Sequence, residues 1–141
     1  MRLIPLIGFL VIAVFLAACG NSNAGDVARS PTAALGPLPT TAPPLPFADN
    51  PDPEACGIPR EWGRDEPGYV TGHYEGELVQ PVVYLYDSHL RREVVGQIPD
   101  GGRVEILLSQ SNPVLDYYLV RSLDLDEPQE GWIPAPFLDL G

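Results

Sequence analysis

The sequence is poor in the residues that build most enzyme and metal sites. Among its 141 residues there are two cysteines, two histidines and no lysine, because all eight basic residues are arginines. Neither the cysteines (Cys19 and Cys56) nor the histidines (His73 and His89) have the spacing of metal ligands. A phosphate-binding glycine loop, a nucleophile elbow and a pair of hydrolytic carboxylates are all missing. We therefore expect a protein that is not an enzyme and that carries no metal and no cofactor.

Two polar clusters have suitable residue types without suitable geometry. Asp87, Ser88 and His89 are consecutive, so their side chains point in different directions and cannot form the hydrogen-bonded relay of a hydrolase. The acidic residues within 124–130 lack the complete ligand set and the glycine of an EF-hand calcium loop. We expect both clusters to be solvated loops.

Basic residues are scarce as well. The 19 acidic residues against eight basic ones give a formal net charge of -11. Nucleic acid binds through lysines and arginines that displace counterions from phosphates, so we expect no nucleic-acid partner. Anionic lipid headgroups and anionic wall polymers are disfavoured for the same reason. A cationic peptide, a polyamine or an uncharged ligand is compatible with this charge.

Long apolar runs are absent except at the start of the chain. After Met1 and Arg2, residues 3–16 are almost entirely apolar, which is shorter than the ~20 residues of a membrane-spanning helix. A basic start, a short apolar run and small residues at its end are typical of a secretory signal peptide. We therefore expect the protein to be exported.

The end of this run carries a short motif, consisting of Leu16, Ala17, Ala18 and Cys19. It resembles the lipobox of bacterial lipoproteins, in which the cysteine thiol receives a diacylglyceryl group and the chain is cut just before it. The resemblance implies a signal peptide over residues 1–18. It also implies a lipoprotein held at the extracytoplasmic membrane surface by acyl chains, such as palmitate, on Cys19. The alternative is an ordinary signal peptide or short anchor in which Cys19 is a passive apolar residue.

Two neighbouring features depend on this lipidation. Gly20 stands where an acidic residue would signal inner-membrane retention, which favours the outer membrane or an outer leaflet. A lipidated Cys19 leaves Cys56 without an intramolecular partner, so Cys56 either pairs with another chain or stays a free thiol.

Residues 19–56, from the lipidated cysteine onward, are expected to form a tether. Proline, alanine, threonine, serine, asparagine and glycine dominate them, and no helix or strand period is present. Such a segment buries too little apolar surface to offset the entropy of ordering, so we expect it to be disordered. The Pro-rich stretches 37–39 and 43–46 favour the extended polyproline II form. Residues 43–46 are also able to fold back onto the domain that follows.

The rest of the chain is expected to form one small all-β domain. Residues 57–77 read as an irregular lead-in anchored by Trp62, and residues 78–141 contain short apolar runs separated by turn signals. These runs predict strands over 79–86, 93–98, 103–108, 117–123 and 131–134, followed by one helical turn over 135–138. The glycines at 101 and 102 predict a tight turn. The expected core consists of Val83, Leu85, Val95, Ile98, Val104, Ile106, Leu119, Trp132, Ile133 and Leu138.

Four segments of this domain carry a family resemblance. They are residues 83–88, 94–107, 116–122 and 131–138, with the turn Gly-Gln-Ile-Pro-Asp-Gly at 96–101 and a closing Gly-Trp-Ile-Pro at 131–134. Together they resemble the bacterial Src-homology 3-like domain, SH3b. The resemblance implies a small, five-stranded SH3-like barrel.

SH3 relatives bind extended ligands on a groove of aromatic side chains. The groove, carried over by position, predicts six ligand-binding residues: Tyr84, Tyr86, Tyr117, Trp132, Pro134 and Phe137. The alternative is that these residues only fill and cap the barrel. The loop 88–93 departs from the family pattern because it is basic where peptide-binding relatives are acidic, which argues against a basic Pro-rich ligand.

The sequence thus predicts a lipid-anchored binding module of the cell envelope. Its barrel would recognise an envelope protein or a peptidoglycan-derived peptide. The alternative is a structural or assembly subunit of an envelope complex, with no free ligand groove.

Overall fold

The computed structural model describes residues 35–141. The expected signal peptide and Cys19 lie outside the described residues. Within 35–141, strands and two single-turn 3-10 helices are the only regular elements, so the predicted all-β class is confirmed. The strands are β1 (Arg60–Glu61), β2 (Gly68–Val70), β3 (His73–Tyr74), β4 (Glu77–Leu78), β5 (Val82–Tyr86), β6 (Val94–Pro99), β7 (Arg103–Gln110), β8 (Tyr117–Ser122), β9 (Glu130–Pro134) and β10 (Leu138–Asp139). The 3-10 turns are η1 (Pro53–Ala55) and η2 (Ala135–Phe137).

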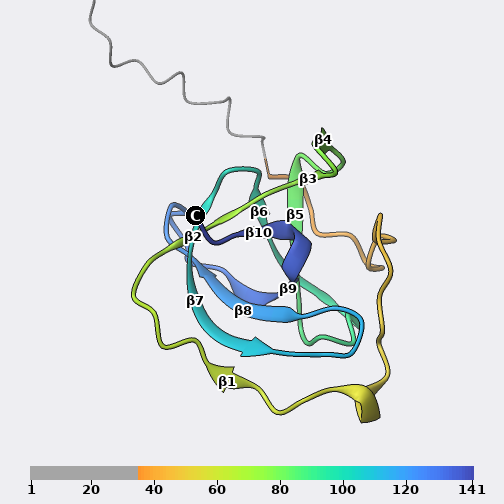
Figure 1. Ribbon diagram of the computed structural model, residues 1–141. Helices are drawn as coiled ribbons and strands as arrows, with labels where there is room; N and C mark the ends of the chain where they lie inside the picture. The colour runs from red at the N-terminus through yellow and green to blue at the C-terminus, as the bar shows by residue number, and fades with distance from the viewer. Residues whose placement is uncertain (1–34) are drawn as a thin grey trace, which may run out of the picture.

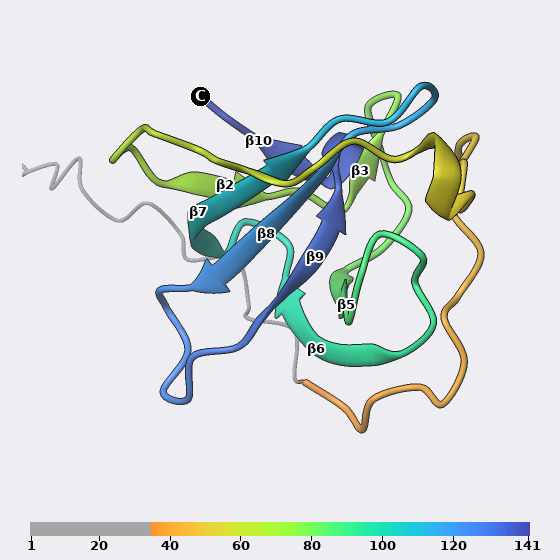
Figure 2. The same cartoon turned by 90° about the horizontal axis from the view of Figure 1, so that it is seen from below.

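Eight of these strands form one strongly curled sheet (Figure 1). Its order is β10, β2, β7, β8, β9, β5 and β6, and β1 pairs with the far end of β7. The short strands β2 and β1 pair with the start of β7 at Val104 and with its end at Ser109, respectively. The view from below shows how the sheet bends around its inner face (Figure 2). β3 and β4 form a separate hairpin.

The later strands agree closely with those expected. β6, β7, β8 and β9 begin and end within two residues of the predicted segments, and η2 occupies the predicted helical turn. β5 begins at Val82 rather than at residue 79, because Pro81 cannot donate a ladder hydrogen bond. The turn between β6 and β7 uses Gly101 with a φ of 79°, a left-handed conformation that favours glycine.

The sheet reaches further toward the N-terminus than expected. Residues 57–77 were predicted to be an irregular lead-in, yet β2 lies inside the sheet between β10 and β7. The Val70 N–H donates to the carbonyl of Gly102 at 2.8 Å, and the Gly101 N–H donates to the carbonyl of Val70 at 2.8 Å. A strand of three residues is too short to show the alternation by which strands are predicted. The domain therefore begins before residue 78, and its sheet has more than the five predicted strands.

The core lies on the inner side of the curl. Its buried cluster consists of Val70, Val83, Leu85, Ile98, Val104, Ile106, Val120, Ile133, Phe137 and Leu138. Three expected core residues were wrong, because Val95 is 43% exposed and Leu119 and Trp132 are half-buried. Leu119 and Trp132 oppose each other on β8 and β9. Side chains alternate along a strand, and the neighbouring Val120 and Ile133 already take the inner side.

Residues 35–50, which we call the strap, lie against the sheet. The strap passes beside β5 and β6 before the chain enters η1 (Figures 1 and 2). Leu45 and Phe47 pack against the buried cluster. The Phe47 ring centroid is 5.2 Å from the ring centroids of both Tyr74 and Phe137. The expected tether of 19–56 therefore gives way, over the strap, to a segment with defined packing partners.

Candidate functional site

Three neighbouring strands position most of the aromatic side chains that were predicted to line a groove. Tyr86 on β5 lies opposite Trp132 on β9, and Tyr117 on β8 lies opposite Pro134 on β9. Directly opposed residues share one face of a sheet, so β9 joins these two pairs into one surface. Tyr84 lies on the same side of β5, two residues before Tyr86. The structure thus brings five of the six predicted residues to the outer side of the sheet, which we call the aromatic surface.

The sixth predicted residue belongs to the core. Phe137 lies in η2 and is a member of the buried cluster. The Phe47 ring from the strap meets it at an interplanar angle of 63°. Phe137 therefore joins the strap to the core and does not line the aromatic surface.

The aromatic surface is covered. Tyr86 is 1% exposed, Tyr117 is fully buried and Pro134 is also buried, whereas Tyr84 and Trp132 are half-buried. The strap and the loop between β5 and β6 contribute the contacts that cover Tyr86 and Tyr117. The predicted groove exists as a surface, and a segment of the same chain already lies on it.

Asp49 of the strap makes the central polar contact of this cover. Its Oδ2 accepts a hydrogen bond from Arg91 Nε at 2.9 Å and pairs with Arg91 Nη2 at 2.6 Å. Its Oδ1 accepts a hydrogen bond from the Tyr117 hydroxyl. Only 11% of the Asp49 side chain and 16% of the Arg91 side chain are exposed. Both oxygens of the carboxylate are therefore used in a mostly buried, charge-assisted cluster.

These contacts shift the pKa values of Tyr117, Tyr86 and Arg91. Burial raises the pKa of Tyr117, and the hydrogen bond to Asp49 and its negative charge raise it further. Burial raises the pKa of Tyr86 by more than Arg91 lowers it. Burial alone would lower the pKa of Arg91, but the hydrogen bond and charge of Asp49 outweigh burial and raise it. Near neutral pH both tyrosines are therefore uncharged beside the Arg91–Asp49 salt bridge.

The loop between β5 and β6 presents Arg91 to the strap. The Asp87 carboxylate accepts hydrogen bonds from the backbone N–H groups of Arg92 and Glu93, each at 3.1 Å. Arg91 itself has a φ of 49°, a conformation that costs a non-glycine residue about 1 kcal/mol or more. Its guanidinium carbon lies 5.5 Å from the ring centroid of Tyr86, within the range of a cation–π contact. The basic loop noted in the sequence thus supplies the cation that holds the strap.

The strap is held by polar contacts at three places along its length. Gln97 Nε2 donates to the carbonyl of Gly36 near its start. Arg91 Nη1 donates to the carbonyl of Pro43 at 3.3 Å. Asp49 provides the third contact near its end. The strap is therefore attached to both β6 and the β5–β6 loop.

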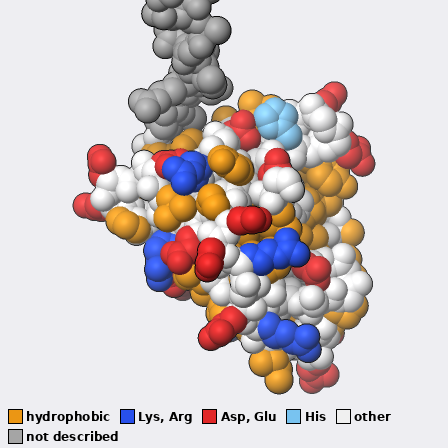
Figure 3. All heavy atoms as spheres, turned by 60° about the vertical axis from the view of Figure 1, so that its left-hand side comes forward, with side chains coloured by type: hydrophobic (Ala, Val, Ile, Leu, Met, Phe, Trp, Pro, Cys, Tyr) orange, Lys and Arg blue, Asp and Glu red, His pale blue; other side chains and the backbone are white. Residues whose placement is uncertain are grey.

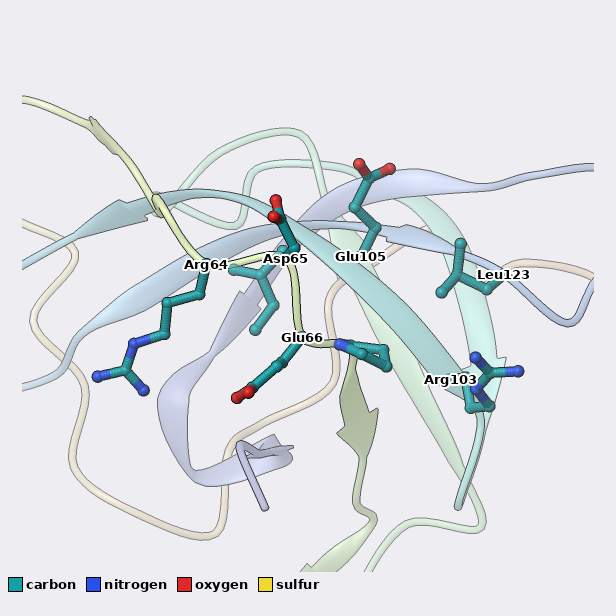
Figure 4. Close-up of a pocket in the computed structure, with 8 residues that line it drawn as sticks. Arg64, Asp65, Glu66, Arg103, Glu105 and Leu123 are labelled. Atoms are coloured by element: carbon teal, nitrogen blue, oxygen red, sulfur yellow. The ribbon is translucent and has the colours of Figure 1, made fainter.

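A hollow lies over β7 and the segment before β2 (Figure 4). It has a volume of about 480 Å³ and is lined by Arg64, Asp65, Glu66, Pro67, Arg103, Glu105, Ile106 and Leu123. Arg103 lies 3.8 Å from Asp124, and Arg64 lies 5.3 Å from the ring centroid of Trp62. Figure 3 shows acidic and basic side chains interspersed with apolar ones over one face of the molecule. The mixed charges of the hollow select no particular ligand.

Cys56 has no disulfide partner among the described residues and is half-buried. Its Sγ donates to the carbonyl of Asp52 at 3.0 Å. Burial and the negative charge of Asp52 raise the pKa of the thiol. A thiol with a raised pKa is a weak nucleophile at neutral pH.

Within residues 35–141, no three histidine, cysteine, aspartate or glutamate side chains are grouped so that they could hold a metal ion. The same residues contain no helix of the length and apolar character needed to cross a membrane. Comparison of the chain with protein-family models, curated proteins and solved structures finds no match.

Sequence reasoning raised a fold-back of residues 43–46, which include Leu45, but it missed three further residues that hold the strap in place: Phe47, Asp49 and Arg91. Phe47 gave a usable signal, because it is the one aromatic residue between positions 16 and 61. A large aromatic side chain in a Pro-rich tether is unusual, since tethers contain few residues that need burial. The pairing of Asp49 with Arg91 joins residues 42 positions apart, and no local pattern predicts it.

Proposed function

We propose that this chain is a lipid-anchored binding protein of the bacterial cell envelope, whose SH3-like domain recognises a protein or a peptidoglycan-derived peptide. The observation that carries the proposal is an extended, Pro-rich segment that packs on the domain, with Phe47 against the core and Asp49 against Tyr117 of the aromatic surface. A surface that holds one extended segment through aromatic, apolar and charged side chains has the chemistry to hold another.

The order of the strands supports an SH3-like domain. The five strands predicted from the resemblance correspond to β5 to β9, which are all members of the curled sheet. β5 and β9, the first and last of the five, pair through Tyr86 and Trp132. Pairing of the first and last strands bends the sheet toward closure, and η2 follows directly after β9.

The proposed anchor is supported by the sequence before the domain. A short apolar run leads to Leu16, Ala17, Ala18 and Cys19, which resemble a lipobox. Two or three acyl chains on one residue hold a protein firmly at a bilayer, whereas one chain holds it only reversibly. A domain displayed in this way meets ligands of the envelope.

A second candidate function is favoured by the burial of the aromatic surface. Tyr86 and Tyr117 are buried under the strap, as expected if these residues only stabilise the domain. The chain would then be a structural or assembly subunit of an envelope complex. Such a subunit co-purifies with fixed partners in constant ratio, whereas a binding protein captures its ligand in a concentration-dependent manner.

Capture from the envelope tests the binding role. The full-length chain with a C-terminal tag is extracted in mild detergent after cross-linking, and its partners are identified. We expect Tyr84→Ala and Trp132→Ala to lower capture at least fivefold, because these half-buried residues contribute area to the surface without filling the core. Tyr69→Ala is the matched control, since Tyr69 is 44% exposed on β2.

Capture that is identical in all three variants would contradict the binding role. Tyr117 and Phe137 are unsuitable for this test, because both are buried. Truncating a buried aromatic residue to alanine costs about 3 to 5 kcal/mol, so those variants would report on folding.

A further inference from the structure

The strap indicates which kind of molecule the aromatic surface fits. We infer that the strap is an exchangeable cover, and that the partner displaces it with an extended peptide segment whose carboxylate enters between Arg91 and Tyr117. This inference rests on the proposed binding role of the same surface, and it names the chemistry of the partner.

The need for a carboxylate follows from the burial of Arg91. Its side chain is 16% exposed, and its donors are used by Asp49 and by the carbonyl of Pro43. A guanidinium stays charged, so loss of Asp49 would leave a mostly buried cation without a partner. The buried Tyr117 hydroxyl would lose its acceptor at the same time. A segment that replaces the strap must therefore bring an anion to this point.

The burial pattern of the strap shows how the rest of the partner segment would lie. Over residues 43–49 burial alternates, with Pro43, Leu45, Phe47 and Asp49 partly buried and the residues between them exposed. A period of two is the pattern of extended backbone with one face against a surface. A matching partner carries an aromatic residue two positions before its carboxylate and apolar residues at the two preceding alternate positions.

The strap can be exchanged because no backbone ladder ties it to the sheet. None of residues 35–50 belongs to a strand. Its backbone is held by the side chains of Gln97 and Arg91. Segments that no ladder ties to a sheet open at a lower free energy than the strands of a core.

Exchange is a competition with a segment of the same chain. A tethered segment reaches effective concentrations in the millimolar range, so it masks the surface from a free peptide. The apparent affinity of a free peptide equals its intrinsic affinity multiplied by the fraction of molecules whose strap is open. Loosening the strap should therefore strengthen binding of a free peptide.

The acidic composition of the chain does not oppose an acidic segment at this point. The formal net charge is -11. Charges further apart than about 8 to 10 Å are largely screened at physiological ionic strength. Arg91 acts on the carboxylate at 2.6 Å in a mostly buried contact, where screening is weak.

A peptide with the sequence of the strap provides the test. The probe is a fluorescent synthetic peptide of residues 42–50, and a second peptide carries Asp49→Asn. Binding to the full-length, detergent-extracted protein is measured by fluorescence anisotropy. We expect protein carrying Asp49→Asn to bind the unaltered peptide at least tenfold more tightly than unaltered protein does. The same variant should prefer the unaltered peptide over the Asp49→Asn peptide at least tenfold.

Asp126→Asn in the protein is the matched control, because it makes the same charge change at an exposed position. It should bind the peptide as weakly as the unaltered protein. If circular dichroism shows that the Asp49→Asn protein does not fold, Phe47→Ala replaces it, since this variant loosens the strap and keeps the ion pair. Equal binding of the two peptides, or no binding by a folded strap variant, would overturn the inference.

The inference and the binding role can fail separately. Peptide exchange without any captured envelope partner would leave the surface chemistry intact and reject the proposed function. Envelope capture that excess strap peptide does not reduce would keep the proposed function and reject this inference.

Discussion

The carboxylate of Asp49 is within hydrogen-bond distance of two donors on Arg91 and one on Tyr117. Removing one partner of a buried ion pair costs about 3 to 5 kcal/mol, because the other charge is left without compensation. We expect Asp49→Ala to lower the free energy of unfolding by about 3 kcal/mol in chemical denaturation. Asp126→Ala, at an exposed position, should change it by less than ~0.5 kcal/mol.

A double replacement separates the charge from the packing. Arg91→Met removes the cation that Asp49→Ala leaves behind, so the double variant should be more stable than Asp49→Ala alone. If the double variant instead loses as much free energy of unfolding as Asp49→Ala and Arg91→Met lose together, the two side chains act independently.

Tyr117 makes the domain sensitive to alkaline pH. Tyrosine in an unfolded chain has a pKa of about 10, and the pKa of Tyr117 is raised in the folded protein. Between these two values the folded state binds more protons than the unfolded state. The contribution of Tyr117 is therefore complete below about pH 10 and is lost as the pH rises toward the folded pKa.

We expect the free energy of unfolding to fall above about pH 10, with Tyr117 contributing about 1.4 kcal/mol per pH unit. Chemical denaturation at a series of pH values should show that the free energy of unfolding of Tyr117→Phe falls less steeply, by about 1.4 kcal/mol per pH unit. Tyr69→Phe removes a hydroxyl from a residue that is 44% exposed and serves as the control. An unchanged slope in Tyr117→Phe would contradict the role given to its hydroxyl.

At the scale of elements, β9 approaches β5 so closely that one position requires glycine. A Cβ on Gly131 would lie 2.8 Å from the Cβ of Leu85 and 3.0 Å from the carbonyl oxygen of Tyr86. One of these atoms belongs to the backbone, so the strands would have to separate. We expect Gly131→Ala to destabilise the domain by about 2 kcal/mol in thermal unfolding. Gly36→Ala is the control, because a Cβ there meets nothing within 4 Å. An equal loss of stability in both variants would contradict a close approach of the strands at Gly131.

The elements that were predictable are those with a local pattern. β6 to β9 have alternating or apolar runs bounded by turn residues, and the sequence placed them within two residues. β2 and β10 have three and two residues, and they form because partners distant in sequence offer them an edge. Alternation also could not choose the inner side of β8, where Val120 is buried and Leu119 is not.

Only the part of the candidate site that lies on the strands of the sheet was predictable. In the sheet register Tyr86 lies opposite Trp132, and Tyr117 lies opposite Pro134. The strap supplies the other half, and its composition is that of a free tether. Its position depends on Asp49, whose partners lie far along the chain.

For the whole molecule, the strap also sets how far the domain stands from the proposed anchor. Fifteen residues separate Cys19 from residue 35. Fully extended, they span at most about 50 Å at ~3.5 Å per residue. Release of residues 35–50 would add a similar length. Under the proposed function, opening the strap would therefore uncover the aromatic surface and extend its reach together.

The last prediction concerns the acyl chains proposed on Cys19. Each buried methylene contributes about 0.8 kcal/mol, so two or three acyl chains hold a protein firmly at a membrane. Cells fed an alkyne analogue of palmitate should label the unaltered protein, which should then sediment with membranes. Cys19→Ser should abolish the label and leave the signal peptide attached, as mass spectrometry would show. Cys56→Ser is the control, because it removes the chain's second thiol and leaves Cys19 in place, so its label should persist. Label that survives in Cys19→Ser would show that another residue is acylated and would contradict the proposed anchor at Cys19.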